Sequence, residues 1–319
     1  MATTLLRANR TLLTAKIETV EGTDPTPVVT TDVIVTTEPK IEPLFVERER
    51  KVIRTGFGKS PGIIIGEGVK VSFQTEMLGS GAAGTAPHFG ALLRACNLTQ
   101  TISAGVSVTY APNSSLLGES VTIYFYKDGK LHKAVGCRGT YKINHKAGEI
   151  ITIDFEMTGW FVAANWNTSL TFPTGTYPTN MNSPIKFLSA SVLLETAAYV
   201  VENISFDLGN TVQKRASGSA VGGVAGYYIT DRISKISVDP EAGNIGGGDY
   251  DPYIVLKESL TNSFSFNCGS AGNRYAFSTT RLIYDKVEEA DRNNVLVYKI
   301  DGTLVPTSAG NDEFSIVFT

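Results

Sequence analysis

Residues 119–160, ESVTIYFYKDGKLHKAVGCRGTYKINHKAGEIITIDFEMTGW, contain the pattern that decides the fold. Residues 121–127 are rich in β-branched and aromatic side chains, which are typical of strands, and the Asp128-Gly129 pair that follows favours a tight hairpin turn. The next run continues to about residue 145 and predicts an unusually long strand. A strand of that length tends to protrude from its own domain and to expose backbone groups that another chain can satisfy. The stretch therefore predicts self-assembly.

The run at 149–158 returns after a turn at Ala147-Gly148 and alternates apolar and polar residues. A period of two predicts a strand with one buried face and one face that meets water or a partner. The apolar side comprises Ile151, Ile153, Phe155 and Met157, and the polar side comprises Thr152, Asp154, Glu156 and Thr158. Asp154 and Glu156 could in principle do acid and base work on a sugar, but on an alternating strand a wetted or interface face is the favoured interpretation.

The composition sets outer limits on the kind of protein. A chain of 319 residues can form one large or two ordinary domains. Only 18% of the residues are charged, compared with about 25% in an average globular protein, which favours a subunit that faces other subunits, although a β-rich fold alone could lower the count. The net charge of -3 disfavours tight binding to nucleic acid phosphates. It leaves passing contact with nucleic acid open.

The cysteines and histidines predict neither a metal site nor a disulfide framework. The cysteines, Cys96, Cys137 and Cys268, are widely spaced and form no CxxC pair, so reduced thiols are expected. Three histidines are too few and too scattered for convergent metal ligands. The N-terminus lacks the apolar core of a signal peptide, and no run reaches the roughly 20 apolar residues that span a bilayer. We expect a protein made in the cytosol, without a membrane contact.

Upstream of the decisive stretch, residues 1–40 predict an extended arm with one or two edge strands, because prolines interrupt any continuous helix. Residues 41–68, IEPLFVERERKVIRTGFGKSPGIIIGEG, then combine a charged centre with a Gly- and Pro-rich end that indicates a long irregular loop. Charge runs are usually solvated, but a salt-bridging contact with a neighbouring subunit is the functional alternative. The candidates for that contact are Glu47, Arg48, Glu49, Arg50, Lys51 and Arg54.

The second half of the chain repeats the order of the first. Residues 204–208 stand where 41–45 stood, and QKR at 213–215 corresponds to ERER at 47–50. ISKISVDPE from residue 233 matches VKVSFQTEM from residue 69, and each is followed by a glycine-rich stretch, a short helix and a long hairpin. The fold class predicted is mainly β, with two tandem β-sandwich or barrel domains at 1–170 and 189–319, joined by a linker at 171–188.

Two glycine-rich motifs fail the tests for nucleotide binding. GFGKS at 56–60 ends like a phosphate-binding loop, but Ile53 stands where that motif requires glycine, and Pro61-Gly62 follows where a helix should begin. GSGAAG at 79–84 lacks the Rossmann spacing and is interpreted as a hinge. No serine occupies a GxSxG elbow. The sequence therefore predicts no enzyme and no cofactor.

Several long stretches together resemble the tail tube proteins, or major tail proteins, of long-tailed, non-contractile bacteriophages (siphophages). The stretches that carry the resemblance are AKIETVEGTDPTP at 15–27, residues 41–77, GSGAAGTAPHFGALLRACNL at 79–98, residues 121–159, NISFDLGNTV at 203–212, ITDR at 229–232 and the end SAGNDEFSIVFT. The resemblance covers most of the chain. It identifies an assembly family and not a reaction.

The resemblance implies two tail-tube-type domains in a ring-forming subunit. In this family, hairpins of neighbouring subunits join into one barrel around a channel, the rings stack into a tube, and DNA passes through at ejection. Two domains per chain imply a pseudo-hexameric ring of three chains, with a ring of six as the alternative. The implied partners are further copies of this chain, tail tip or baseplate and tail terminator proteins, the tape measure protein inside the tube, and viral DNA without sequence-specific binding. The implied location is the virion tail, assembled in the host bacterial cytoplasm.

A channel that conducts DNA should not bind it, so its lining should be neutral or acidic and repel phosphates over a Debye length of about 10 Å. Asp154 and Glu156 are the channel-lining candidates of the first half, and Asp285, Glu288 and Glu289 are those of the second half. Two other classes share the strand-rich pattern. They are a secreted or surface fibre or adhesin, which should carry an export signal, and a β-sandwich carbohydrate-active enzyme, which should show an acidic cleft.

Overall fold

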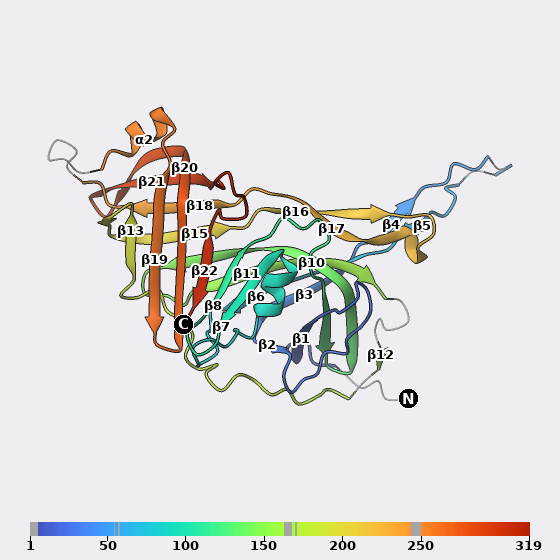
Figure 1. Cartoon of the computed structure of the whole chain (residues 1–319). Helices are drawn as coiled ribbons and strands as arrows, with labels where there is room; N and C mark the ends of the chain where they lie inside the picture. Colours follow the sequence, from blue (N-terminus) through green and yellow to red (C-terminus); the bar gives the residue numbers. More distant parts are fainter. Residues whose placement is uncertain (1–5, 54, 57, 163–167, 170, 244–249) are drawn as a thin grey trace.

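The computed structural model describes the chain except for residues 1–5, 54, 57, 163–167, 170 and 244–249. Strands make up 53% and helices 5% of the structure, so the fold is mainly β, as predicted. Figure 1 shows the strands of the second half at the left, those of the first half at the right, and two hairpins that extend to one side.

The strands before residue 170 are β1 (Thr11–Ile17), β2 (Val33–Ile34), β3 (Thr37–Pro43), β4 (Val46–Arg48), β5 (Ile63–Gly66), β6 (Val69–Glu76), β7 (Leu98–Ser103), β8 (Ser107–Pro112), β9 (Val121–Lys127), β10 (Lys130–Lys146), β11 (Thr152–Phe161) and β12 (Thr168–Ser169). The later strands are β13 (Ser191–Leu194), β14 (Ala197–Ala198), β15 (Val201–Asp207), β16 (Asn210–Ala216), β17 (Val224–Arg232), β18 (Lys235–Pro240), β19 (Asn262–Ser270), β20 (Asn273–Arg292), β21 (Val295–Leu304) and β22 (Ser315–Phe318). The helices are α1 (Gly90–Ala95), the 3-10 turn η2 (Val221–Gly223) and α2 (Pro252–Glu258).

The predicted hairpin is confirmed as β9, β10 and β11. Gly129 adopts φ 82° in the turn between β9 and β10, a value that glycine reaches without steric cost. β10 is bent by a bulge between Val135 and Arg138, where Gly136 has φ 61°. A Cβ at Gly136 would lie 2.5 Å from the Trp160 ring, so the bulge requires glycine. Before the bulge β10 pairs with β9, and at its other end it pairs with β15.

The bend lets β10 join the two halves of the chain in one antiparallel row of eight strands. The printed pairings give the order β3-β6-β11-β10-β15-β18-β21-β20. The joint between the halves is β10 with β15, which runs from Lys142 opposite Asp207 to Lys146 opposite Asn203. A second connection is β22, which pairs with β8 of the first half and β20 of the second.

The repeat predicted from the sequence extends to strand register. β4 pairs with β5 through Val46–Gly66, Glu47–Ile64 and Arg48–Ile63, with an irregularity after Val46. β16 pairs with β17 through Thr211–Asp231, Val212–Ile229 and Gln213–Tyr228, with an irregularity after Thr211. All six positions differ by the same offset along the chain, which also makes Lys70 equivalent to Lys235. The sequence alignment was therefore wrong by two residues where it matched 204–208 to 41–45, and by one residue where it matched residue 233 to residue 69. The unit β3-β4-β5-β6 is therefore equivalent to β15-β16-β17-β18.

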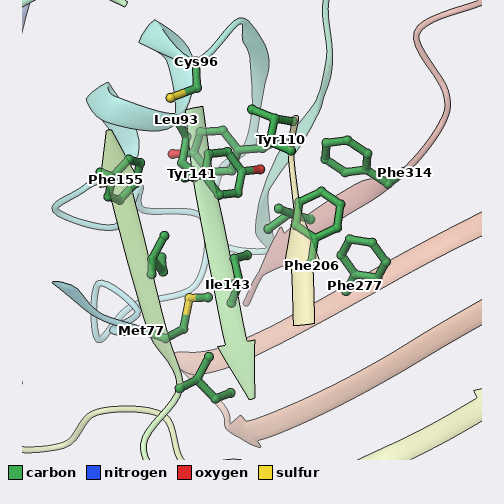
Figure 2. Close-up of a cluster of buried hydrophobic side chains, with 14 of the residues drawn as sticks. Met77, Leu93, Cys96, Tyr110, Tyr141, Ile143, Phe155, Phe206, Phe277 and Phe314 are labelled. Carbon is green, nitrogen blue, oxygen red and sulfur yellow. The ribbon is translucent and has the colours of Figure 1, made fainter. Parts of the chain in front are cut away.

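One hydrophobic cluster lies behind the row and contains side chains of both halves (Figure 2). The ring of Phe206 lies 6.0 Å from that of Tyr141, 5.0 Å from that of Phe277 and 4.9 Å from that of Phe314, measured between centroids. Such aromatic groups contribute both buried area and edge-to-face contacts. Packing against Phe206 therefore fixes the halves to each other behind the β10–β15 joint.

Both short helices occur near their predicted positions and pack onto the sheet. Leu92 and Leu93 of α1 are buried. α2 begins after Asp251, whose side chain accepts a hydrogen bond from Tyr253 N at 2.9 Å. It ends at Glu258, and the residue that follows, Ser259, has φ 52°. In the described part of the chain, no helix is long and apolar enough to cross a membrane.

Candidate assembly surface

The outward side chains of the eight-strand row form a polar surface, which we call the sheet face. One line of residues in register crosses both halves: Gln74, Asp154, Lys142, Asp207, Lys235 and Thr303. Acidic and basic groups lie opposite one another along it, an arrangement that stabilises cross-strand pairs. The alternation predicted for β11 is therefore part of a pattern that continues over the joint.

Asp154 and Glu156 both lie on the sheet face and are held by neighbouring strands. The Asp154 carboxylate accepts hydrogen bonds from Gln74 Nε2 at 2.8 Å and from Asn144 Nδ2 at 2.7 Å. Glu156 forms an ion pair with Lys70 at 2.7 Å. The side chain of Ile153, which precedes Asp154 on β11, points to the opposite side of the sheet and is buried in the core. The two carboxylates are thus fixed components of a polar surface.

The second-half candidates divide between two faces. Asp285 is the extra residue of a bulge in β20 and accepts a hydrogen bond from Thr303 Oγ1 at 2.6 Å on the sheet face. Glu288 lies on the same face, paired with Lys286 at 2.8 Å. Glu289 is one residue further along the strand and lies opposite Tyr298, which is buried against α2. Asp154, Glu156, Asp285 and Glu288 therefore share a face that Glu289 does not.

Two shallow depressions on the sheet face overlap at the joint, where both are lined by Lys142 and Asp207. Together they are lined by six carboxylates and four lysines. The carboxylates are Glu38, Asp154, Glu156, Asp207, Asp285 and Asp301, and the lysines are Lys40, Lys142, Lys235 and Lys286. The surface is therefore slightly acidic, with lysines interspersed among the acids. The sequence reasoning missed these lysines, although they occupy the same strand face as the acids.

The row of eight strands ends in two edges without a partner strand among the described residues. β3 pairs only with β6, and residues 286–292 of β20 pair only with β21. An unpaired edge presents free backbone N–H and C=O groups that favour pairing with another chain. Each edge is therefore a candidate contact.

The charged candidates of residues 47–51 lie on a hairpin that projects from the body beside β16 and β17 (Figure 1). We call residues 46–66, which include β4 and β5, the arm. The name applies to this hairpin and not to the extended segment predicted for residues 1–40. Glu47, Arg48, Glu49, Arg50 and Lys51 are exposed, and Glu49 forms an ion pair with Lys59. Arg54 lies outside the described residues. The predicted irregular loop thus contains a short hairpin, because Ile63 and Ile64 pair with Arg48 and Glu47 of β4.

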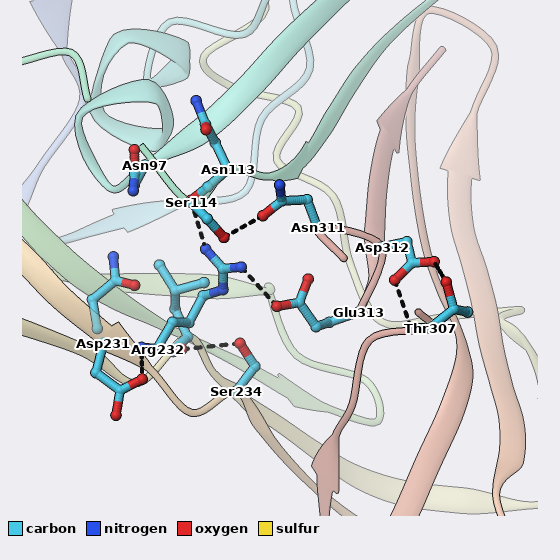
Figure 3. Close-up of polar contacts among 12 residues, drawn as sticks. Asn97, Asn113, Ser114, Asp231, Arg232, Ser234, Thr307, Asn311, Asp312 and Glu313 are labelled. Atoms are coloured by element: carbon cyan, nitrogen blue, oxygen red, sulfur yellow. Dashed lines mark hydrogen bonds and ion pairs between the residues drawn. The ribbon is translucent and has the colours of Figure 1, made fainter. Parts of the chain in front are cut away.

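The equivalent hairpin, β16–β17, packs against the first half through a polar cluster at its base (Figure 3). Arg232, which is nearly buried, donates from Nη1 to Asn113 O at 2.9 Å and pairs through Nη2 with Glu313 at 2.7 Å. Ser114 donates to Asn311 in the same cluster. The cluster brings together three segments that are remote in sequence, so the string ITDR at 229–232 alone could not reveal it.

Two histidines make the fold sensitive to acid: His145, which is buried, and His88, which is partly exposed. Burial lowers the pKa of His88 and His145 to about 4, and His145 Nδ1 donates to Ile204 O at 2.9 Å across the β10–β15 joint. Both pKa values lie below that of an unfolded histidine, so their stabilisation is complete above pH 6.5 and is lost as the pH falls toward 4. We expect the free energy of unfolding to fall by roughly 2 kcal/mol per histidine between pH 7 and pH 5.

Urea denaturation at the two pH values measures this loss. In the His145→Gln variant, the loss between pH 7 and pH 5 should be smaller than that of the wild type by roughly 2 kcal/mol, since one titrating group is gone. Equal urea midpoints at pH 7 and pH 5 for the wild type would contradict the assignment of neutral histidines.

Among the described residues, no three His, Cys, Asp or Glu side chains are grouped so that they could hold a metal ion. A comparison with protein families matches residues 8–243 to a model described as phage tail tube protein. That span includes the arm, the hairpin β9–β10–β11, the β10–β15 joint and β16 to β18. No curated protein matches the chain.

Proposed function

Because this chain belongs to the phage tail tube protein family, we propose that three copies of it form a pseudo-hexameric ring whose sheet faces line a channel for DNA. The family is structural and non-enzymatic, and its members are tail components of the virion that self-assemble into a tube. The rings of this chain stack into such a tube, and the channel conducts DNA from capsid to host at ejection.

The observation that carries this proposal is the β10–β15 joint. The row consists of two equivalent sets of four strands, β3-β6-β11-β10 and β15-β18-β21-β20, and the joint pairs the last strand of the first set with the first strand of the second. The same pairing between β20 of one chain and β3 of the next would satisfy both free edges. Repeated head to tail, a heterologous contact of this kind closes into a ring.

The width of the channel favours three chains. Strands lie about 4.8 Å apart, so three rows of eight strands, 24 in all, give a barrel about 37 Å wide between backbones if the strands are not tilted. Six such rows would give roughly 73 Å. A DNA duplex with its hydration shell fits the narrower barrel after side chains are added, whereas the wider one would leave it far from every wall.

The charges of the sheet face suit passage without binding. Lys70 and Lys286 are paired with Glu156 and Glu288, and carboxylates outnumber lysines in the depressions at the joint. A phosphate that approaches such a surface meets lysines that lie among a larger number of carboxylates, and no cluster of positive charge alone. DNA is therefore kept from adhering, while the alternating charges hold neighbouring strands together.

The remaining assignments follow from this role. Residues 1–170 and 189–319 supply one tube domain each, connected by residues 171–188. The rings at the two ends of the tube contact the tail tip or baseplate proteins and the tail terminator protein. The tape measure protein occupies the channel before ejection. The tube of a siphophage tail is assembled in the host cytoplasm. Asp154, Glu156, Asp285 and Glu288 line the channel, and Glu289 faces α2 instead.

Electron microscopy of the purified protein over a concentration series, with native mass measurement, tests the ring. We expect hollow rings or tubes and a ring of three 34.2 kDa chains, about 103 kDa. A ring of twice that mass with true sixfold density would refute the three-chain arrangement. A monomer that persists after tail tip components are added would refute ring formation itself.

A further inference from the structure

We propose that the arm of one chain docks onto β20 and β21 of the next chain in the ring, as the hairpin β16–β17 docks onto β10 and β11 within a chain. The proposal rests on the ring described above. It identifies the surface that a second copy of this chain occupies, in addition to the paired strand edges.

The arm and β16–β17 are the same structural unit. Each leaves the first strand of a four-strand set, pairs in the same register with the same irregularity, and returns to the second strand of the set. In the sheet, the set that carries β16–β17 begins with β15, and the strands next to β15 on the other side of the joint are β10 and β11. The set that carries the arm begins with β3. In the ring, the strands next to β3 would be β20 and β21 of the neighbouring chain.

The docked hairpin shows what such a contact contains. Trp160 Nε1 donates to Val224 O at 3.0 Å, and Arg138 donates from Nη1 to Tyr227 O. At the base, Asn210 Nδ2 donates to Gly139 O at 2.9 Å. The hairpin thus covers the place where β10 bends and the end of β11.

The arm carries an isoleucine at the position of Ile229 in β17, but in the arm this side chain is exposed. Ile229 of β17 is 7% exposed, whereas its counterpart in the arm, Ile64, is 50% exposed, and Ile63 and Ile65 on either side are 49% and 51% exposed. Three consecutive half-exposed isoleucines leave apolar surface in contact with water, which is unfavourable. A second copy would cover them as the first half covers Ile229.

The receiving surface follows from the register of β20 and β21. Arg138 lies opposite Thr158, which lies opposite Lys70, and Ile283 lies opposite Thr303, which lies opposite Lys235. Since Lys70 and Lys235 are equivalent, Ile283 takes the place of Arg138. Trp160 follows Thr158 by two residues and Val305 follows Thr303 by two residues, so Val305 takes the place of Trp160.

The residues at these equivalent positions on β20 and β21 are complementary to the arm. Ile283 and Val305 are only partly exposed and offer apolar side chains where the first half has a charged and an indole group. Asp285, exposed beside them, provides a carboxylate. The arm sequence has five basic and two acidic residues, so its net positive charge complements that carboxylate.

Disulfide trapping tests the contact. The arm residue equivalent to Val224 is Lys59, which should lie at Val305 of the neighbouring chain. Chains with Lys59→Cys are mixed with chains with Val305→Cys, assembled and oxidised with diamide, and the products are separated without reductant. The native cysteines are buried, so only the introduced thiols should react. We expect covalent dimers that contain one chain of each kind.

The matched control pairs Lys59→Cys with Thr101→Cys, which is exposed on β7 and remote from the proposed contact, and should give no dimer above background.

A second variant, Ile64→Asp, should raise the concentration needed for rings by roughly tenfold, because it removes an isoleucine from the covered surface. The corresponding change at an exposed residue elsewhere, Ile102→Asp, should leave that concentration unchanged.

The outcomes separate this inference from the ring itself. If the wild type forms rings while Lys59→Cys and Val305→Cys give no more dimer than the control pair, the docking is wrong and the ring stands. Rings of Ile64→Asp at the wild-type concentration would likewise overturn the docking. If the wild type forms no rings even with tail tip components, the ring proposal fails, and the docking fails with it.

Discussion

Virions whose tube subunit carries Asp154→Lys and Glu156→Lys are expected to release their DNA at least roughly tenfold more slowly than the wild type. Each three-chain ring would gain six lysines in the channel and lose six carboxylates. A lysine about 4 Å from a phosphate is attracted by about 1 kcal/mol in water, and DNA must break such contacts at every ring. The rate of DNA release after receptor addition, followed by a DNA-binding dye, measures the effect.

Salt and matched variants identify the cause. The delay should shrink as salt is raised, since screening weakens contacts with phosphate. Glu195→Lys and Glu258→Lys together make the same change in charge at exposed positions off the sheet face and should release DNA normally. Release at the wild-type rate by virions with Asp154→Lys and Glu156→Lys, given tubes of normal length, would show that these residues do not line the channel.

Arg138→Met is expected to lower the free energy of unfolding by about 3–5 kcal/mol, the usual cost of removing one partner from a buried ion pair. Arg138 is 2% exposed. Its guanidinium pairs with Glu21 at 2.7 Å and donates from Nε and Nη2 to Gly118 O at 3.1 and 2.6 Å, besides its bond to Tyr227 O. Methionine fills much of the space but leaves these acceptors without a donor.

Arg94→Met is the control for this prediction. Arg94 also pairs with a carboxylate, that of Glu119, but its side chain is 32% exposed, and exposed pairs contribute only about 0–1 kcal/mol. Urea denaturation of the two variants compares the losses directly. A loss for Arg138→Met as small as that for Arg94→Met would show that the network around Arg138 does not hold β16–β17 to the first half.

The local structure of the hairpin could be predicted from the sequence because it depends on neighbouring residues. The turn at Asp128-Gly129 and the alternation after Ile151 decide which side chains are buried, and β9 spans the predicted residues 121–127. Composition and pattern also predict the mainly β fold. The order of elements predicts the repeat, which strand register then extends to the arm and β16–β17.

The rest depends on contacts between remote segments. The bulge at Asp285 shifts the alternation of β20 by one residue, so counting along the chain cannot tell that Glu288 lies on the sheet face and Glu289 does not. The cluster of Arg232, Glu313 and Asn113 requires three segments that meet only after folding. No local signal reports that β10 turns from β9 to β15.

The β10–β15 joint has a consequence for the accuracy of assembly. Because residues 171–188 connect the two halves, this joint forms by folding within one molecule, at an effective concentration that a short tether can raise to the millimolar range. In the proposed ring of three chains, only the remaining contacts would depend on collisions between molecules, so six positions would need three encounters in place of six. Since positions would be added in pairs, a ring of five or seven positions could not close. In that ring the covalent connection would exclude the nearest errors in ring size.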